Sequence, residues 1–486
     1  MQMRRVATLI VAIGLTVTGI GTSAALGHAG PARPAATARL TGLALRAGPG
    51  VTVPAKVVRF EGYVIDVPAS WPVYRLDRDH ARCVRYDQHA VYLGRPGSDQ
   101  QCPAHLVGRV ETISLAPGAS GGPGIPASPQ PPGPQWQAAA SGLSLGQLQA
   151  GGVVLQDPQD HQFWGSFSHQ GLTISATYGT DAGLVGQIIR TLRWSGAAPQ
   201  AGPGQAGPGS AGGQPAPAGH PAAASRAHAA PAVLTRAARR NRPALPGAGS
   251  RRHFGRGIQH GFDVCATPSV ATMRKWRQVF SAIAIYIGGP EAACGLGNLS
   301  ASWVRTVTGM GWSLIPTYVG RQAPCTRFSV RIRKGHAHVE GMAAARDAIA
   351  LAASLGIGRG APIYDDMEFY NDRNGVCRRQ VLSFLNSWTR ELHRRGYVSG
   401  VYSSADAGVK NLGQSASVYQ WRLAKPDSVW FGLWDGHANL RGMPYLLPSW
   451  WSRGHRIKQY MGSHRRRIGG VTLDIDSDMV RGAVYR

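Results

Sequence analysis

The stretch APIYDDMEFYNDRNGVCRRQVLSFLNSWTRELHRRGYVSGVYSS, residues 361–404, decides the fold. It begins and ends with short runs rich in apolar, β-branched and aromatic residues. Between them, residues 378–396 carry apolar side chains at a spacing of three to four, which is typical of an amphipathic helix. A helix between two such runs predicts two parallel strands joined by a helical crossover.

The same alternation extends in both directions along the chain. Strand candidates occupy residues 261–265, 281–288, 313–320, 361–370, 398–404, 428–434, 455–462 and 470–477. Helical periodicity separates the first five of them, at residues 269–280, 300–311, 338–356 and 378–396. Eight repeats in about 230 residues predict an α/β fold, a (β/α)₈ TIM barrel over residues 257–486. An open, doubly wound parallel sheet is the alternative.

A small β-rich (α+β) module is predicted upstream, over residues 55–195. Alternating apolar residues after Lys56 and again in GLTISATYG indicate strands, and DAGLVGQIIRTLR (181–193) indicates a helix. A Pro/Gly/Ser-rich insert interrupts the module near residues 117–134. Its polar residues form no catalytic pattern, and we expect them to be solvated or to cap helices: Asp87, His89, Asp99 and His105. The module is therefore interpreted as a binding or structural unit.

Two segments of low complexity flank this module, at residues 30–54 and 196–256. Both are dominated by Pro, Ala and Gly, and they contain too few large apolar residues to offset the entropy of ordering. We interpret them as disordered linkers. The second is rich in Arg, so it either is simply solvated or holds the protein against an anionic cell-wall surface.

The N-terminus predicts export. Arg4 and Arg5 precede an apolar run over residues 6–20, and small residues follow up to Ala29, so residues 1–29 read as a cleaved signal peptide. The alternative, a membrane anchor, needs about 20 apolar residues, more than this run supplies. Sec and twin-arginine export both stay open, and the mature protein is expected to be secreted or cell-wall-associated, without a transmembrane segment.

Cysteine content agrees with an oxidising compartment. Six cysteines in an exported chain predict three disulfides, and each half of the chain holds an even number: Cys83 and Cys102, then Cys265, Cys294, Cys325 and Cys377. The pairing among the last four stays open. A zinc site is disfavoured because no close Cys-x-x-Cys pair is present. The net charge of +27 favours anionic partners in general, but the absence of a nucleic-acid-binding motif argues against DNA or RNA.

Candidate functional residues collect at the predicted strand ends, where barrels carry their active sites. The candidates are Asp263, Tyr318, Asp366, Glu368, Tyr402, Trp434, Gln459, Asp474 and Asp476. Strand alternation directs Asp366 and Glu368 inward together, with Cα atoms about 6–7 Å apart. Such proximity raises the pKa of one carboxyl and leaves the other ionised, as glycoside hydrolysis requires. A solvated acidic loop is the alternative; neither a metal nor a cofactor is predicted.

Residues 258–484 resemble a known family through GFDVCATPS, IYIGG, NLSASWV, GWSLIPTYVGRQAPC, PIYDDMEFY, GYVSGVYSS and GGVTLDIDSD. The family is the glycoside-hydrolase-like domain of unknown function in exported, cell-wall-associated bacterial proteins. It is similar to the Chalaropsis-type lysozymes, which are muramidases with a (β/α)₈ barrel and a D-x-E motif. The resemblance implies Glu368 as general acid/base and Asp366 as its partner or as stabiliser of an oxazolinium intermediate.

The resemblance also implies that Asp263, Asp474 and Asp476 position the substrate. Many relatives resemble YYDME, so Asp365 stands where they carry an aromatic residue. Together these features predict an exported glycoside hydrolase that acts on peptidoglycan or a related wall glycan. The alternative is a non-catalytic glycan-binding protein that uses the same cleft, in which Tyr402 and Trp434 stack on sugar rings.

Overall fold

The computed structural model describes residues 44–46, 51–117, 137–138, 152–159, 161–167, 171–196 and 257–486. The predicted signal peptide, nearly all of the second predicted linker and most of the 117–134 insert lie outside these residues. Part of the first predicted linker is described, because β1 (Ala44–Arg46) and the start of β2 (Thr52–Phe60) fall within it. Residues Leu43–Arg486 form one compact unit.

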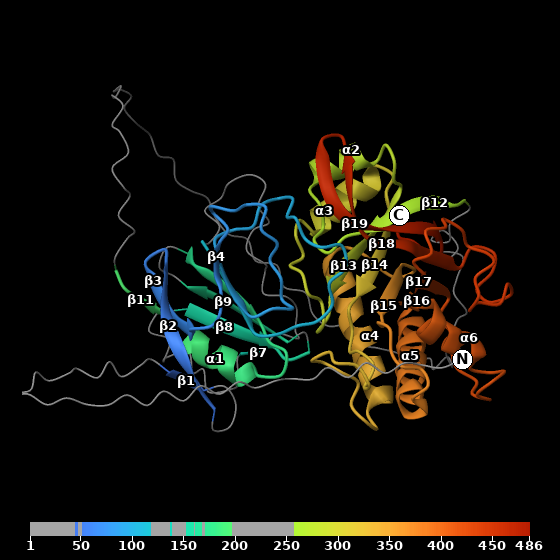
Figure 1. Ribbon diagram of the computed structural model, residues 1–486, viewed down its shortest axis with the longest axis horizontal. Coiled ribbons are helices and arrows are strands. Elements are labelled where there is room, and N and C mark those ends of the chain that lie inside the picture. Colours follow the sequence, from blue (N-terminus) through green and yellow to red (C-terminus); the bar gives the residue numbers. More distant parts are fainter. Residues whose placement is uncertain are drawn as a thin grey trace, which may run out of the picture. The chain divides into compact units, whose positions relative to one another are not determined.

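The upstream module contains two sheets and a helix (Figure 1). One sheet has the strand order β1-β2-β3-β11, with β3 at Tyr63–Pro68 and β11 at Arg193–Trp194. The other has the order β4-β5-β6-β10-β9-β8-β7. Its strands are β4 (Val73–Arg75), β5 (Ala90–Leu93), β6 (Thr112–Ala116), β7 (Gln137–Ala138), β8 (Gly152–Asp157), β9 (Gln162–Phe167) and β10 (Thr173–Thr177).

Helix α1 (Ala182–Arg190) lies in the segment predicted to be helical. The side chain of Asp181 accepts a hydrogen bond from the backbone N–H of Leu184, a standard N-terminal cap. The apolar face of α1, which includes Ile188 and Ile189, is buried in one cluster with residues of both sheets. The two sheets and the helix therefore share a single core.

Residues 257–486 are all described, and their eight strands close into a barrel. The strands are β12 (Gln259–Asp263), β13 (Ala282–Gly288), β14 (Ser313–Tyr318), β15 (Pro362–Asp366), β16 (Val398–Ser404), β17 (Ser428–Gly432), β18 (Arg456–Ile468) and β19 (Val471–Arg481). The helices are α2 (Val270–Trp276), α3 (Ala301–Gly309), α4 (Ala337–Ser354), α5 (Gly375–Arg395), the π-helix η3 (Ala405–Val409) and α6 (Lys410–Gln414). The predicted strands and helices thus fall where the sequence places them.

Packing follows the alternation of the strands. Tyr364 and Trp430 point into the barrel interior with small and aliphatic residues, whereas Ile363 packs outward in the layer shared with the helices. Gly400 makes room for Tyr364, because a Cβ at position 400 would lie only 2.4 Å from its ring. Trp388 is completely buried in the outer layer.

The predicted (β/α)₈ TIM barrel is wrong, because the eight strands close into a barrel of mixed direction and not every strand is followed by a helix. Each strand from β12 to β18 is parallel to the next one, but β19 is antiparallel to both of its neighbours, β18 and β12. The barrel therefore contains both parallel and antiparallel strand pairs. Gly469 and Gly470, both with positive φ, join β18 to β19 in a two-residue hairpin turn, which only antiparallel strands allow. No helix of this described region lies between β17 and β19. Closure of the barrel also excludes the open sheet.

The two modules contact each other through backbone and side-chain hydrogen bonds. The backbone N–H of Tyr86 donates to the carbonyl of Ala293 at 2.7 Å, and that of Gly108 donates to the carbonyl of Glu291 at 2.8 Å. Asp99 accepts hydrogen bonds from the backbone and the hydroxyl of Ser269, the N-cap residue of α2. These contacts place the loop that contains residues 101–110 against the barrel.

Three disulfides confirm the prediction from the cysteine count, and none joins the two halves of the chain. The pairs are Cys83–Cys102, Cys265–Cys294 and Cys325–Cys377. They indicate an oxidising environment. Among the described residues, no helix combines the length and apolar character needed to cross a bilayer.

Candidate functional site

The two carboxylates of the D-x-E motif lie at the end of β15. Asp366 is the last residue of the strand and is completely buried, while Glu368 follows in the next loop and stays partly exposed. Gln322, from the loop after β14, fixes the backbone here. Its amide nitrogen donates to the carbonyl of Asp366 at 2.7 Å, and its amide oxygen accepts from the N–H of Glu368 at 2.8 Å.

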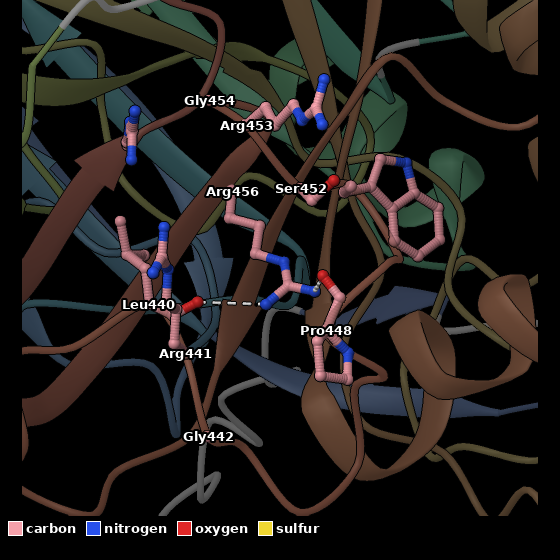
Figure 2. Close-up of a pocket in the computed structure, with 10 residues that line it drawn as sticks. Leu440, Arg441, Gly442, Pro448, Ser452, Arg453, Gly454 and Arg456 are labelled. Atoms are coloured by element: carbon pink, nitrogen blue, oxygen red, sulfur yellow. Dashed lines mark hydrogen bonds between the residues drawn. The ribbon is translucent and has the colours of Figure 1, made fainter.

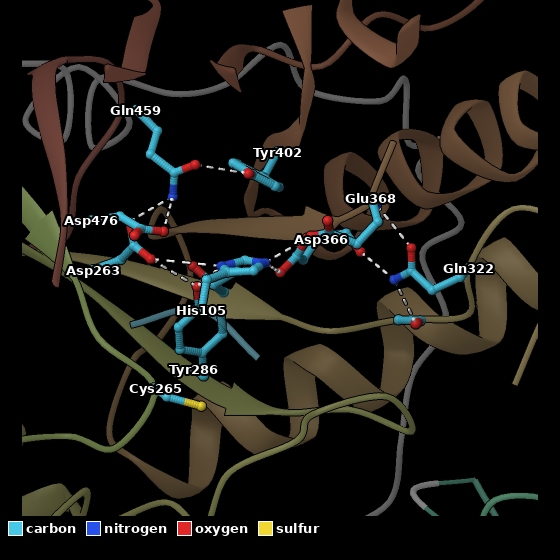
Figure 3. A network of polar contacts seen from close by, with 12 residues as sticks. His105, Asp263, Cys265, Tyr286, Gln322, Asp366, Glu368, Tyr402, Gln459 and Asp476 are labelled. Atoms are coloured by element: carbon cyan, nitrogen blue, oxygen red, sulfur yellow. Dashed lines mark hydrogen bonds and ion pairs between the residues drawn. The ribbon is translucent and has the colours of Figure 1, made fainter. Parts of the chain in front are cut away.

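The upstream module contributes a histidine to this site (Figure 3). His105 Nε2 lies 2.8 Å from Glu368 Oε1 and 3.9 Å from Asp366 Oδ2. Its other ring nitrogen, Nδ1, lies 2.8 Å from the hydroxyl of Tyr286, which donates its own hydrogen to Asp263 at 3.1 Å. Both ring nitrogens of His105 therefore face acceptors, which is the arrangement of a doubly protonated imidazolium.

The pKa values of the three groups shift in mutually consistent directions. Burial opposes charge on His105, but the charge of Glu368 and hydrogen bonds to Asp263 and Glu368 raise its pKa well above 6.5. Burial also raises the pKa of Glu368, but His105 outweighs it and lowers the pKa below its ordinary value. Burial, and then the charge of Glu368, raise the pKa of Asp366 well above its usual range. These directions favour a proton on Asp366 and a charge on Glu368.

A second group of polar side chains lies on the other side of His105. Gln459 donates to Asp263 at 2.9 Å and to Asp476 at 3.0 Å, and its amide oxygen accepts from the hydroxyl of Tyr402 at 3.0 Å. Burial, and then the charge of Asp263, raise the pKa of Asp476 to about 8. The mouth of the barrel therefore concentrates acidic groups that are protonated or paired with His105.

The structure brings most of the predicted site residues together. Asp263, Asp366, Glu368, Tyr402, Gln459 and Asp476 belong to one network around His105 (Figure 3). Trp434 joins it through its indole N–H, which donates to Gln459 at 2.8 Å, and its ring is 64% exposed.

Two predicted residues lie apart from this network. Tyr318 is buried in the outer layer, where it stacks on Trp388 and donates to Asp347. Asp474 lies on β19 but accepts a hydrogen bond from Ser463 on the β18–β19 hairpin.

Four network residues were not singled out from the sequence. Tyr286 and Gln322 occupy positions at or after strand ends, as the predicted residues do, and Asp478 continues the inward alternation of Asp474 and Asp476. Those three could have been found by applying the strand-end and alternation rules throughout. His105 could not, because it belongs to the other module, where it was expected to be solvated.

Residues 274–480 match a family model described as Rv2525c-like, glycoside hydrolase-like domain. The barrel is similar to a glycoside hydrolase-like domain. No curated protein matches the chain. The finer resemblance to Chalaropsis-type lysozymes stays a prediction.

Two solved structures have weaker similarity to part of this chain. An uncharacterized protein of B. stearothermophilus is 15% identical, with a TM-score of 0.32, over 46% of this chain and 99% of the other. The catalytic domain of endolysin ply40, from bacteriophage P40 of Listeria monocytogenes, is 11% identical, with a TM-score of 0.28, over 46% and 94%. At these scores neither similarity defines a fold or an activity for this chain.

Two further features of the barrel concern ligands. His105 with Asp366 and Glu368, or with Asp263 and Asp476, presents nitrogen and oxygen atoms within 4.8 Å of one another, an arrangement that could hold a divalent cation. Both nitrogens of His105 already face hydrogen-bond partners, so the described contacts account for this cluster without an ion.

A separate pocket of about 450 Å³ lies around Arg456 and shares no residue with the carboxylate network (Figure 2). The guanidinium of Arg456 donates to backbone carbonyls of the surrounding loop, including Leu440 and Leu447. Arg456 therefore holds this loop in place, and the pocket is not the site of the carboxylate chemistry.

Proposed function

We propose that the protein is an exported glycoside hydrolase that acts on peptidoglycan or a related cell-wall glycan, with Asp366 and Glu368 as the working pair. The observation that carries the proposal is geometric: Asp366 and Glu368 lie next to each other at the mouth of the barrel, in one network with Asp263 and Asp476. Glycoside hydrolysis needs one carboxylic acid and one carboxylate beside the scissile bond. The similarity to a glycoside hydrolase-like domain supports the same reaction class.

The proposed roles follow from the environment of each group. Glu368, the more exposed of the two, protonates the leaving oxygen, and buried Asp366 stabilises positive charge that develops on the sugar or on an oxazolinium. Asp263 and Asp476, fixed by Gln459, bind sugar hydroxyls. With His105 in place the protonation is the reverse, because the imidazolium keeps Glu368 ionised. Without that cation, burial raises the pKa of Glu368, so the proton of the pair can move to Glu368, and loss of the Glu368 charge then lowers the pKa of Asp366.

The test is release of reducing ends from purified peptidoglycan by the full chain. We expect activity that Glu368→Gln reduces by about a thousandfold or more, because the variant cannot donate a proton. Glu391→Gln is the matched control, since Glu391 lies on α5 and pairs with arginines away from the network. If Glu368→Gln cleaves as fast as the control, the assignment of Glu368 fails. If no enzyme form cleaves any wall glycan, hydrolysis fails.

Non-catalytic glycan binding is the second candidate, favoured by exposed aromatic rings. Trp434 is 64% and Phe369 59% exposed, and such rings can stack on sugars. Gly462 leaves space for the indole, because a Cβ there would lie 2.9 Å from it. Retention on insoluble wall material that survives Glu368→Gln but is lost with Trp434→Ala would favour this candidate.

A further inference from the structure

His105 occupies the centre of the site that the proposed function assigns to a sugar. Its ring reaches Glu368 with one nitrogen and the Tyr286–Asp263 pair with the other, so it spans the space between the proposed acid/base and the proposed substrate-binding acids. The ring centre also lies 5.7 Å from that of Tyr402. Asp263, Asp366 and Asp476 have no exposed surface in this arrangement. A sugar ring and His105 cannot occupy this space together.

The charge of His105 matches what the site should stabilise. The transition state of glycoside hydrolysis carries positive charge at the sugar ring, and a site complementary to it binds cations held in the same place. A protonated imidazole beside Glu368, Asp366 and Asp263 is such a cation. The same acids that would stabilise the reaction thus hold His105 in the mouth.

We propose that His105 is an internal, competitive occupant of the barrel, and that glycan reaches Asp366 and Glu368 only when the loop of residues 101–110 withdraws. This inference rests on the proposed function and adds a mechanism by which access of the glycan to the site is regulated. In the closed state His105 occupies the space beside Glu368 and keeps its carboxylate charged, so Glu368 can neither reach a leaving oxygen nor protonate one. Withdrawal exposes the carboxyl and frees it from the cation.

The way the loop is anchored allows withdrawal. Residues 101–110 contain no regular strand or helix and meet the barrel through polar contacts and through two small apolar clusters, around Leu106 and Val107. Arg109 donates its backbone N–H to Glu291 at 2.8 Å and its guanidinium to the carbonyl of Ala292 at 3.0 Å. An isolated antiparallel bridge joins Val107 to Ala292. Asp99, bonded to Ser269, holds the start of the same region. The large apolar cores of the two modules contain no residue of this loop, so its withdrawal breaks only these contacts and the two small clusters.

The experiment compares the full chain with His105→Ala in two assays. The first assay measures release of reducing ends from soluble peptidoglycan fragments. Removing the His105 side chain should raise the rate of cleavage about tenfold or more. This is the change expected when the closed state loses one charged hydrogen bond. The double variant His105→Ala/Glu368→Gln should be inactive. The second is labelling of Glu368 by a water-soluble carbodiimide and glycine ethyl ester, read by mass spectrometry, where exposure should rise by a similar factor.

Two further variants separate a gate from a folding defect. His89→Ala is the matched control, because His89 contacts only its own module, through the carbonyl of Glu111 and the ring of Trp71. It should leave both assays unchanged. Asp99→Ala loosens the loop without touching the carboxylates, so it should also raise the labelling of Glu368. Circular dichroism and melting of each variant confirm that both cores remain folded.

The two assays distinguish failure of the gate from failure of the hydrolase. Equal cleavage and equal labelling in wild type and His105→Ala overturn the gate and leave hydrolysis standing. Lower cleavage in folded His105→Ala also overturns it, because His105 would then assist the reaction. If no form cleaves, hydrolysis fails and the labelling decides: increased labelling of Glu368 supports the gate, and unchanged labelling overturns it.

Discussion

Asp365→Asn should stabilise the protein at neutral pH. Asp365 is completely buried, and both of its carboxyl oxygens lack a hydrogen-bond partner among the described residues. Burial alone raises its pKa well above 3.8, so the folded chain holds a proton there that the unfolded chain releases. Gly320 provides the space, because a Cβ at that position would lie 2.6 Å from Oδ1 of Asp365.

The size of the stabilisation by Asp365→Asn follows from the proton that the folded chain holds on Asp365. Each pH unit above the ordinary pKa of a group that stays protonated costs about 1.4 kcal/mol, so the cost of Asp365 grows as the pH rises from 3.8 toward its raised pKa in the folded state. Since the folded state binds the extra proton, stability falls as the pH rises through this window. Asparagine has a similar shape and no charge, so it removes the pH-dependent cost. The gain of Asp365→Asn should therefore be largest at pH 7 and vanish near pH 4.

Urea denaturation of the full chain, followed by tryptophan fluorescence at pH 4 and pH 7, measures this difference. Asp372→Asn is the control, because Asp372 pairs with Lys410 at the surface of the barrel and its loss should cost at most about 1 kcal/mol at pH 7. The reasoning is refuted if Asp365→Asn lowers stability at pH 7, or if it changes stability equally at both pH values.

Three other substitutions test the network and the modules. Gln459→Glu replaces the amide nitrogen that bonds two carboxylates with an oxygen that repels them, so melting experiments at pH 7 should show a loss of at least about 3 kcal/mol that shrinks as the pH is lowered. Replacing Cys325 and Cys377 by serine opens a loop of 52 residues and should cost about 4 kcal/mol by denaturation. Burial lowers the pKa of His161 to about 4, so the unfolded chain binds its proton first and stability should fall by about 3 kcal/mol as the pH drops from 6.5 to 4. His161→Asn, which tolerates the positive φ of this position, should flatten that pH dependence in the same measurement.

Local periodicity was enough to predict most elements of the barrel. Residues 361–404 form β15, α5 and β16 because their apolar spacing suits a buried strand, an amphipathic helix and a second buried strand in turn. Asn374 caps α5 and Gly396, with positive φ, ends it. Each of these signals acts over a few residues, so the strands and the helix can be predicted from the local sequence alone.

The number of strands does not determine the direction of the last strand, which depends on the length of the connection that precedes it. Parallel neighbours need a crossover of about a dozen residues or more, and fewer separate the runs at 455–462 and 470–477. The polar residues between them, from Ser463 to Arg467, continue β18 as a mostly exposed stretch up to the Gly469–Gly470 turn. A hairpin was therefore the only connection that this spacing allowed.

Tyr318 was predicted at the mouth because it lies at a strand end, but its side chain points away from the barrel interior. Ile315 points into the barrel, so strand alternation directs Thr317 inward and Tyr318 outward, toward α4 and α5. For Asp263, Gln459 and Asp476 the strand-end rule was sufficient, because those side chains converge on the interior from adjacent strands. Position along a strand and the face of that strand must agree before a residue is assigned to the mouth.

Strand rules cannot predict the position of His105, because periodicity within one module does not show which of its residues contacts another module. The charge of the barrel mouth does indicate that a basic residue must come from elsewhere. Among the described residues, His105 is the one basic group that contacts Asp366 and Glu368, and it also reaches Asp263. A buried ring of acids must be protonated or receive a cation from elsewhere, because the energy of several unpaired carboxylates in one small space is prohibitive. An acidic barrel mouth without a basic residue of its own therefore predicts an external cation, and the upstream module supplies it.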